Sequence, residues 1–257
     1  MLTFEQACNL RIGIHLSGPG SGDNLILSSL PENYFRNTGK MLVGDKSNPI
    51  FKHNPYVDSE SYADIWLTQQ QICDGGSYLV RTLKNRHPHP SIPYEHCQFF
   101  SLPKCYLRHS RLYIHEDLKT IHNKVCVHTS GRSSGTLSEE IIERIENNYK
   151  DYHLVQTGGP SDRKVKSAEN KTGLSLLDTA KEIAEAAIFI GVDSGAGYHV
   201  ANCYPKVRKK LIINYFSEEQ FETLSPLYKD APWWEFNIET YNSFNYDVGC
   251  SMSYLKI

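Results

Sequence analysis

Four loops rich in glycine and hydroxyl residues have the composition of sites that hold phosphate groups. They are SGPGSGD (17–23), TSGRSSGT (129–136), TGGPSD (157–162) and DSGAGYH (193–199). Glycine lets a backbone approach an anion closely, and a helix start offers free N–H groups and the positive end of a dipole. Residues 18–22 read G-x-G-x-G, not G-x-G-x-x-G, and no loop ends in G-K-[ST]. The loops therefore predict a phosphate-bearing ligand, but neither a dehydrogenase nor a P-loop site.

Each of these loops follows a short apolar segment that is typical of a buried strand. The segments are LRIGIHL (10–16), KVCVH (124–128), YHLVQT (152–157) and IFIGV (188–192). Two helices are predicted between them, 138–150 and 175–187, with Ser138 and Ser175 as N-caps. A short helix is expected after Tyr198, and KKLIINYF (209–216) is a further strand. This alternation predicts an α/β fold with a parallel, doubly wound sheet, whose carboxyl edge carries the loops.

The first half of the chain is less regular. KMLVGD (40–45) and YADIWLT (62–68) are further strand candidates, whereas residues 69–123 show no clear pattern. A fresh strand begins after HEDLKTIHN (115–123), so we expect a domain boundary there.

Composition argues against several classes of protein, although a neutral total charge does not exclude a local nucleic-acid-binding patch. The net charge is −2, which gives no overall basic field of the kind that marks nucleic-acid binders. Seven cysteines without a CxxC pair fit reduced thiols better than a disulfide framework. The one dense histidine cluster, RHPHP (86–90), lies in a proline-rich stretch and makes a poor metal site. With no secretory signal and no long apolar run, we expect a cytoplasmic protein.

Taken together, these segments resemble the ADP-heptose lipopolysaccharide heptosyltransferase family. The similarity is clearest over 124–216, in HTSGR (128–132), LVQTGGP (154–160) and FIGVDSGAGYHVA (189–201). It extends to GSGDNLILSSLP (20–31) and HNPYVD (53–58) in the first half. The resemblance implies two Rossmann-like domains facing a cleft, the GT-B fold, in a shortened member with a reduced N-terminal domain. It places an acceptor-side domain at 1–118 and a nucleotide-sugar-binding domain at 119–257, with roughly the last 25 residues packing back on the first.

The resemblance also implies roles for individual residues. Asp23 would be the general base for the acceptor hydroxyl, the alternative being that it caps the helix NLILSSL. The residues expected to bind the donor are Gly22, Thr129, Ser130, Gly131, Arg132, Gly158, Gly159, Asp193, Ser194, Gly195 and His199. For His199 the alternative is a structural histidine behind the loop, and for Gly158 and Gly159 a plain turn.

Two departures from the family pattern concern the donor site. Three residues, Ala196–Tyr198, separate Gly195 from His199, where the family has two. The lysine expected after the phosphate loop is missing, which leaves Arg132, or else Arg163 or Lys164, to supply positive charge.

The resemblance predicts an inverting glycosyltransferase that uses a nucleotide sugar as co-substrate and needs no other cofactor. The chain has no D-x-D motif, so we expect no metal. A cell-surface saccharide such as a lipopolysaccharide core is the expected acceptor. The alternative acceptor is a hydroxylated base in DNA, for which RTLKNRHPH (81–89) and KCYLRHSR (104–111) would supply a basic face.

Two further alternatives belong to other classes. One is a non-catalytic nucleotide-sugar binder, and the other is a sugar-nucleotide epimerase. The aromatic segment PWWEFNIETYNSFNY (232–246) would pack on the first domain, stack on a ligand or form an interface, and packing is the commonest fate of such residues.

Overall fold

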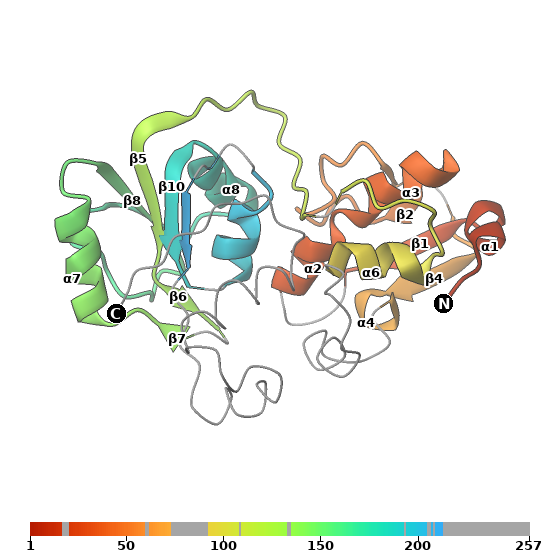
Figure 1. The fold of residues 1–257 in the computed structure, drawn as a ribbon, viewed down its shortest axis with the longest axis horizontal. Coiled ribbons are helices and arrows are strands. Elements are labelled where there is room, and N and C mark those ends of the chain that lie inside the picture. The colour runs from red at the N-terminus through yellow and green to blue at the C-terminus, as the bar shows by residue number, and fades with distance from the viewer. Residues whose placement is uncertain are drawn as a thin grey trace. The chain divides into compact units, whose positions relative to one another are not determined.

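The structure, a computed structural model, is drawn in Figure 1. It describes residues 1–16, 21–59, 62–72, 92–107, 109–132, 135–192, 194–204, 207 and 209–212. These residues fall into two compact units, which meet in the sequence between Tyr113 and Ile114. The domain limits of 1–118 and 119–257 stay a prediction.

The second unit is built on a five-stranded parallel sheet of order β11-β10-β5-β8-β9. The strands are β5 (Ile121–His128), β8 (His153–Gly158), β9 (Glu169–Thr172), β10 (Ala186–Gly191) and β11 (Lys209–Ile212). Strand β5 is central, and the chain order reverses there, with β8 and β9 on one side and β10 and β11 on the other. Helices α7 (Glu139–Asn148) and α8 (Leu176–Ala184) lie on opposite faces (Figure 1). The predicted parallel, doubly wound sheet is confirmed.

Helices α7 and α8 form where the sequence predicts them, because in each helix the N-cap residue precedes the apolar stripe. On α7 three isoleucines, Ile141, Ile142 and Ile145, are buried against Val125 and Val127 of β5 in one core cluster. The Ser138 hydroxyl accepts a hydrogen bond from the Ile141 N–H, and Ser175 caps α8 in the same way. Both predicted caps are confirmed, each satisfying an N–H that the helix leaves without a partner.

The predicted end of α8 and the predicted starts of β10 and β5 differ from the structure by two or three residues. Helix α8 ends at Ala184, not at residue 187, and β10 already begins at Ala186. Strand β5 begins at Ile121, three residues before its predicted start. Glu185, the C-cap of α8, hydrogen-bonds Lys124 of β5, so a contact distant in sequence ends a helix that local propensity would continue.

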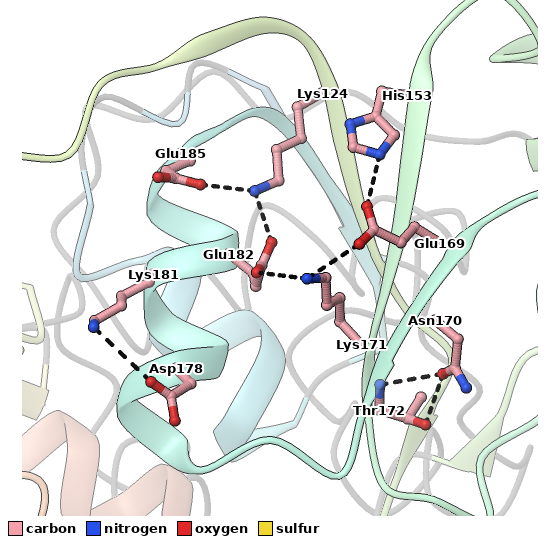
Figure 2. A network of polar contacts seen from close by, with 10 residues as sticks. All are labelled: Lys124, His153, Glu169, Asn170, Lys171, Thr172, Asp178, Lys181, Glu182 and Glu185. Atoms are coloured by element: carbon pink, nitrogen blue, oxygen red, sulfur yellow. Dashed lines mark hydrogen bonds and ion pairs between the residues drawn. The ribbon is translucent and has the colours of Figure 1, made fainter.

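A network of charges ties α8 to the strands beside it (Figure 2). The Lys124 side chain is 3% exposed, and its Nζ lies 2.8 Å from Glu182 Oε2 and 2.9 Å from Glu185 Oε2. Burial by itself lowers the pKa of Lys124, but hydrogen bonds and charges from the two glutamates outweigh it, and the net pKa is raised. Nearby, Glu169 of β9 bonds both Lys171 and His153. Lys124 lies in the first half of β5, four residues before His128, where that strand ends.

The first unit holds a four-stranded parallel sheet of order β3-β2-β1-β4. The strands are β1 (Ile12–His15), β2 (Leu42–Gly44), β3 (Val57–Asp58) and β4 (Ile65–Thr68). The helices are α1 (Phe4–Asn9), α2 (Ser21–Leu27), α3 (Leu30–Thr38), α4 (Gln69–Ile72) and α6 (Ile92–Phe99). Strands β1, β2 and β4 confirm the three predicted segments. In the described part of the chain, no helix is both long and apolar enough to cross a membrane.

Candidate functional site

The last rung of the second sheet brings three of the predicted loops together. His128 at the end of β5 lies in register with Gly191 on β10 and with Thr157 on β8. Because the three strands are parallel neighbours, the loops that follow them leave the sheet at the same edge. Strand β5 is also where the strand order reverses, and doubly wound sheets bind their ligands at such a point.

The loop after β5 is a small hairpin. Strand β6 (Ser130–Gly131) pairs antiparallel with β7 (Gly135–Thr136), and the Leu137 N–H closes the hairpin on the Thr129 carbonyl at 2.8 Å. Ser130 and Gly131 are half-buried and Arg132 is exposed. Thr129 is fully buried, and its hydroxyl donates to the Arg163 carbonyl at 2.8 Å. Thr129 thus holds the hairpin in place.

Gln156 of β8 connects this hairpin to the loop that follows β8. Its Nε2 donates to the Arg163 carbonyl at 2.8 Å, and its Oε1 accepts from the Val165 N–H at 2.9 Å. The Arg163 guanidinium in turn donates to the Leu137 carbonyl at 2.7 Å. Buried polar groups of this kind are costly unless they are paired, so these bonds fix the two loops relative to each other.

The loop after β8 depends on glycine. Gly158 has φ +127°, a backbone conformation that other residues rarely adopt. A Cβ there would collide with Asp162 Oδ2 and would lie 3.3 Å from His128 Cε1. The Asp162 carboxylate is held in this position because it accepts the Gly159 N–H at 2.8 Å.

The loop after β10 forms a π-turn, Gly195–His199. The Ser194 hydroxyl caps it by accepting the Gly197 N–H at 3.1 Å. The His199 N–H donates to the Ser194 carbonyl, five residues back, at 3.2 Å. Ser194 and Gly195 are half-buried, whereas the His199 side chain is 6% exposed. π-Turns are rare and occur often at functional sites.

The loops after β8 and β10 approach the His128 ring, and Gly191 of β10 lies against the His128 backbone. A Cβ on Gly197 would lie 2.9 Å from His128 Cγ, and one on Gly191 would lie 2.7 Å from the His128 carbonyl. The imidazole is 3% exposed, and burial lowers its pKa, opposed by the Asp162 carboxylate and by a hydrogen bond to the Ser130 backbone. His128 Nδ1 has no hydrogen-bond partner among the described residues. An unpaired buried nitrogen at a strand end is the kind of group that a ligand satisfies.

In the first unit, the predicted catalytic loop follows β1. Residues 17–20 lie outside the described part of the chain, and Gly22 and Asp23 belong to the first turn of α2. Asp23 is therefore inside the helix and does not precede it as an N-cap would. The next residue, Asn24, is buried, and its Oδ1 has no partner within the described residues.

An aromatic pair lies at the end of the same sheet. Trp66 on the edge strand β4 lies opposite Gly13 of β1, whose missing Cβ would come within 2.6 Å of Trp66 Cδ2. The ring also stacks on His15, with centroids 4.4 Å apart, and remains 43% exposed. Neither residue belongs to a motif that the sequence pattern distinguishes.

HNPYVD (53–58) forms a turn and an edge strand. The Asn54 Oδ1 accepts from the Tyr56 N–H at 2.9 Å, and Asp58 of β3 pairs with Arg11 at 3.2 Å. In KCYLRHSR (104–111), residues 104–107 and 109–111 are described. Lys104 lies over the Tyr106 ring and Arg111 over the Tyr113 ring, so both charges border aromatic surface.

Several predicted features lie outside the described residues. They are Asp193, RTLKNRHPH (81–89), RHPHP (86–90) and PWWEFNIETYNSFNY (232–246). The roles assigned to residues of the second unit stay predictions as well. Sequence reasoning missed His128, Gln156 and Asp162, although His128 directly precedes the loop that was singled out.

Comparison with known proteins shows what the fold resembles. No protein-family model matches the sequence, and no curated protein matches it. Among solved structures, a family 9 glycosyl transferase from Veillonella parvula DSM 2008 has a TM-score of 0.57 at 12% identity, covering 80% of this chain and 81% of that one. The iron-containing dodecameric glycosyltransferase TibC of enterotoxigenic E. coli H10407 has a TM-score of 0.55 at 15% identity, covering 79% and 59%.

E. coli heptosyltransferase WaaC, solved with ADP-2-deoxy-2-fluoro heptose, has a TM-score of 0.51 at 12% identity, covering 81% of this chain and 91% of that one. At such low identities the likeness concerns the fold. The chain shares the α/β fold, with parallel sheets, of family 9 glycosyltransferases.

Proposed function

We propose that this protein is an inverting glycosyltransferase that moves a sugar from a nucleotide-sugar donor to a hydroxyl group, without a metal. One observation carries the proposal: three glycine-containing loops converge on the last rung of a parallel sheet, where the strand order reverses, in a chain with a glycosyltransferase fold. Ligand sites of doubly wound sheets form at this position, and it suits a ligand with phosphate groups.

The donor diphosphate would lie against the hairpin after β5 and the turn after β10. Ser130, Gly131 and Ser194 are half-buried, so hydroxyl and N–H groups remain within reach of a ligand at that edge. Arg132, exposed on the hairpin, would add positive charge. Negative charge develops on the diphosphate as it departs, and donors fixed in advance stabilise that charge most effectively. In this arrangement Thr129 and Gln156 hold the loops and need not touch the donor.

The acceptor would be activated in the first unit. Its hydroxyl oxygen attacks the anomeric carbon of the donor sugar, and the bond from that carbon to the diphosphate oxygen breaks. The proton of the hydroxyl passes to the carboxylate of Asp23, and the electron pair of the broken bond leaves with the nucleoside diphosphate. One displacement of this kind inverts the configuration at the anomeric carbon. General-base help of this type contributes about 10²–10⁴-fold to a rate.

A saccharide is the acceptor that we propose first. Exposed Trp66, stacked on His15, offers an aromatic face in the unit that would bind the acceptor. Ring faces carry negative charge density and attract the C–H groups of a sugar, and they also stack on nucleic-acid bases. Sugar transfer to a hydroxylated base in DNA is therefore the alternative result of the acceptor screen.

The test begins with thermal unfolding in the presence of nucleotide sugars and nucleoside diphosphates. A ligand that binds only the folded state raises Tm, and 100-fold excess over Kd stabilises by about 2.7 kcal/mol. The stabilising donor is then assayed against saccharides and against DNA that contains hydroxymethylated bases. If no nucleotide sugar raises Tm, the proposed class is wrong. Turnover of the donor without an acceptor indicates an epimerase, and binding without turnover indicates a non-catalytic binder.

Asp23→Asn tests the general base with the donor so identified. We expect a fall in kcat of about 10²-fold or more, with donor affinity unchanged, because the amide cannot take the proton. Asp45→Asn is the matched control, since that carboxylate bonds Ser47 in an exposed turn of the same unit. Full activity of Asp23→Asn would refute the role of Asp23 while leaving donor binding intact.

A further inference from the structure

His128 is a buried ionisable group at the centre of the candidate site, and the reaction proposed above gives it no task. The rim of its ring is enclosed by two loops: Gly197 lies against Cγ and Cδ2, and Gly158 lies against Cε1. Nδ1 is bonded to both Cγ and Cε1, so it lies between these two contacts. It has no hydrogen-bond partner among the described residues. Nδ1 is therefore a nitrogen at which the ring can take up a proton.

The charge balance of the site supplies the second observation. The lysine that the resemblance leads one to expect after the phosphate loop is absent, and the Arg163 guanidinium donates to the Leu137 carbonyl. A departing nucleoside diphosphate carries two or more negative charges. An imidazole enclosed by two of the loops at this sheet edge is well placed to offset one of them.

We propose that His128 takes up one proton from water at Nδ1 when a nucleoside diphosphate binds, and that the resulting imidazolium compensates charge on the leaving group. The inference rests on the proposed function. It makes His128 a positioning residue, because it acts by charge and by its packing against the loops.

The surroundings of the ring favour such a change. In the free protein, burial disfavours the charged ring, and the Asp162 carboxylate from the loop after β8 opposes that effect only in part. Cys126, two residues earlier on the same face of β5, stays neutral because burial raises its pKa to about 12. Lys124, two residues before Cys126, is paired with Glu182 and Glu185. His199 lies in the turn after β10. A nearby anionic ligand would raise the pKa of His128, because an opposite charge favours the charged form of the ring.

Calorimetry measures the proton directly. ADP, UDP, GDP and CDP are titrated into the protein at pH 7.5, and the tightest binder is repeated in buffers that differ in ionisation enthalpy. The slope of observed enthalpy against buffer enthalpy gives the number of protons taken up. We expect up to about one proton more for the wild type than for His128→Gln. Above pH 7.5 the affinity of the wild type should fall by up to about tenfold per pH unit relative to that variant. The ionisation of the nucleotide itself contributes equally to both.

His153→Gln is the matched control. That histidine lies at the start of β8, is 48% exposed and pairs with Glu169, so its loss should leave the proton count unchanged. Nuclear magnetic resonance of the wild type with labelled histidine gives a second readout that does not depend on a variant's folding. The His128 ring should change from the neutral to the imidazolium form on saturation.

The outcomes separate the two proposals. Nucleotide binding with equal proton uptake in the wild type and His128→Gln, or a ring that stays neutral in the saturated complex, overturns the role of His128 alone. Absence of binding by all four nucleotides overturns the proposed function, and this inference with it. Extra proton uptake by the wild type, retained in His153→Gln, supports both.

Discussion

Replacing Gly158 with alanine should destabilise the protein much more than the same change at Gly135. Both glycines have positive φ, +127° and +78°, but nothing lies within 4 Å of a Cβ at Gly135. For Gly135→Ala we therefore expect only backbone strain, about 1–2 kcal/mol. At Gly158 the strain is about 1–3 kcal/mol. The new methyl also displaces the Asp162 carboxylate from the Gly159 N–H, and loss of that charged hydrogen bond adds about 1.5–3 kcal/mol. The sum is about 2.5–6 kcal/mol.

Urea unfolding followed by circular dichroism measures the free energy of unfolding of both variants. An unchanged m value indicates that only stability has changed. Adding Asp162→Ala separates strain from collision, because it removes the atom that the methyl would meet. In that background Gly158→Ala should cost only its backbone strain, so the two substitutions should be strongly non-additive. Equal losses at Gly158 and Gly135, or additivity with Asp162→Ala, would refute the assigned role of the Asp162 carboxylate.

Two other substitutions test the packing that supports the sheets. Lys124→Met should lower the free energy of unfolding by about 1–3 kcal/mol, because it leaves two glutamates without the buried amine, whereas Lys181→Met at the surface should change little. The folded pKa of Lys124 is raised, so the contribution of its charge to the free energy of unfolding is fully present below the ordinary lysine pKa of about 10.4. It is lost as the pH rises through the folded pKa. A stability difference between the wild type and Lys124→Met that vanished at pH 8 would contradict this reasoning. Gly13→Ala should cost about 1–3 kcal/mol because its methyl would meet the Trp66 ring, and Trp66→Leu should largely remove that cost in the double variant. Denaturant unfolding of the two single variants and the double variant measures the coupling, and additive losses would refute the contact.

Local pattern was enough to predict the sheet of the second unit. KVCVH, YHLVQT and IFIGV are short apolar runs, and Ser138 and Ser175 stand just before periodic apolar stripes. These features act within a few residues, so a single sequence displays them. Strand β9 was missed because ENKT (169–172) is polar, and as an edge strand it is held by pairing with β8 alone.

The supporting contacts of the candidate site could not be predicted in the same way. Gln156 bonds the Arg163 carbonyl and the Val165 N–H, which are loop atoms seven and nine residues away. Nothing in the strand YHLVQT distinguishes this glutamine from any other polar residue. The same holds for His128, which is surrounded by Gly158, by Gly191 and by Gly197, residues 30 or more positions away in the sequence. Such contacts depend on tertiary structure. The sequence indicated the candidate site only through the composition of its loops.

The turn after β10 contains three residues between Gly195 and His199, where the heptosyltransferase pattern that the sequence resembles has two. In an α-helical turn the Ser194 carbonyl would accept from the residue four positions on, but here it accepts from His199, five positions on. The wider turn takes up the additional residue, while Ser194 still caps it and Gly197 still lies against His128. An ordinary helical bond, from the Asn202 N–H to the Tyr198 carbonyl, follows at once. Relative to the heptosyltransferase pattern that the sequence resembles, the bond from the His199 N–H to the Ser194 carbonyl gives room for one additional residue inside the turn.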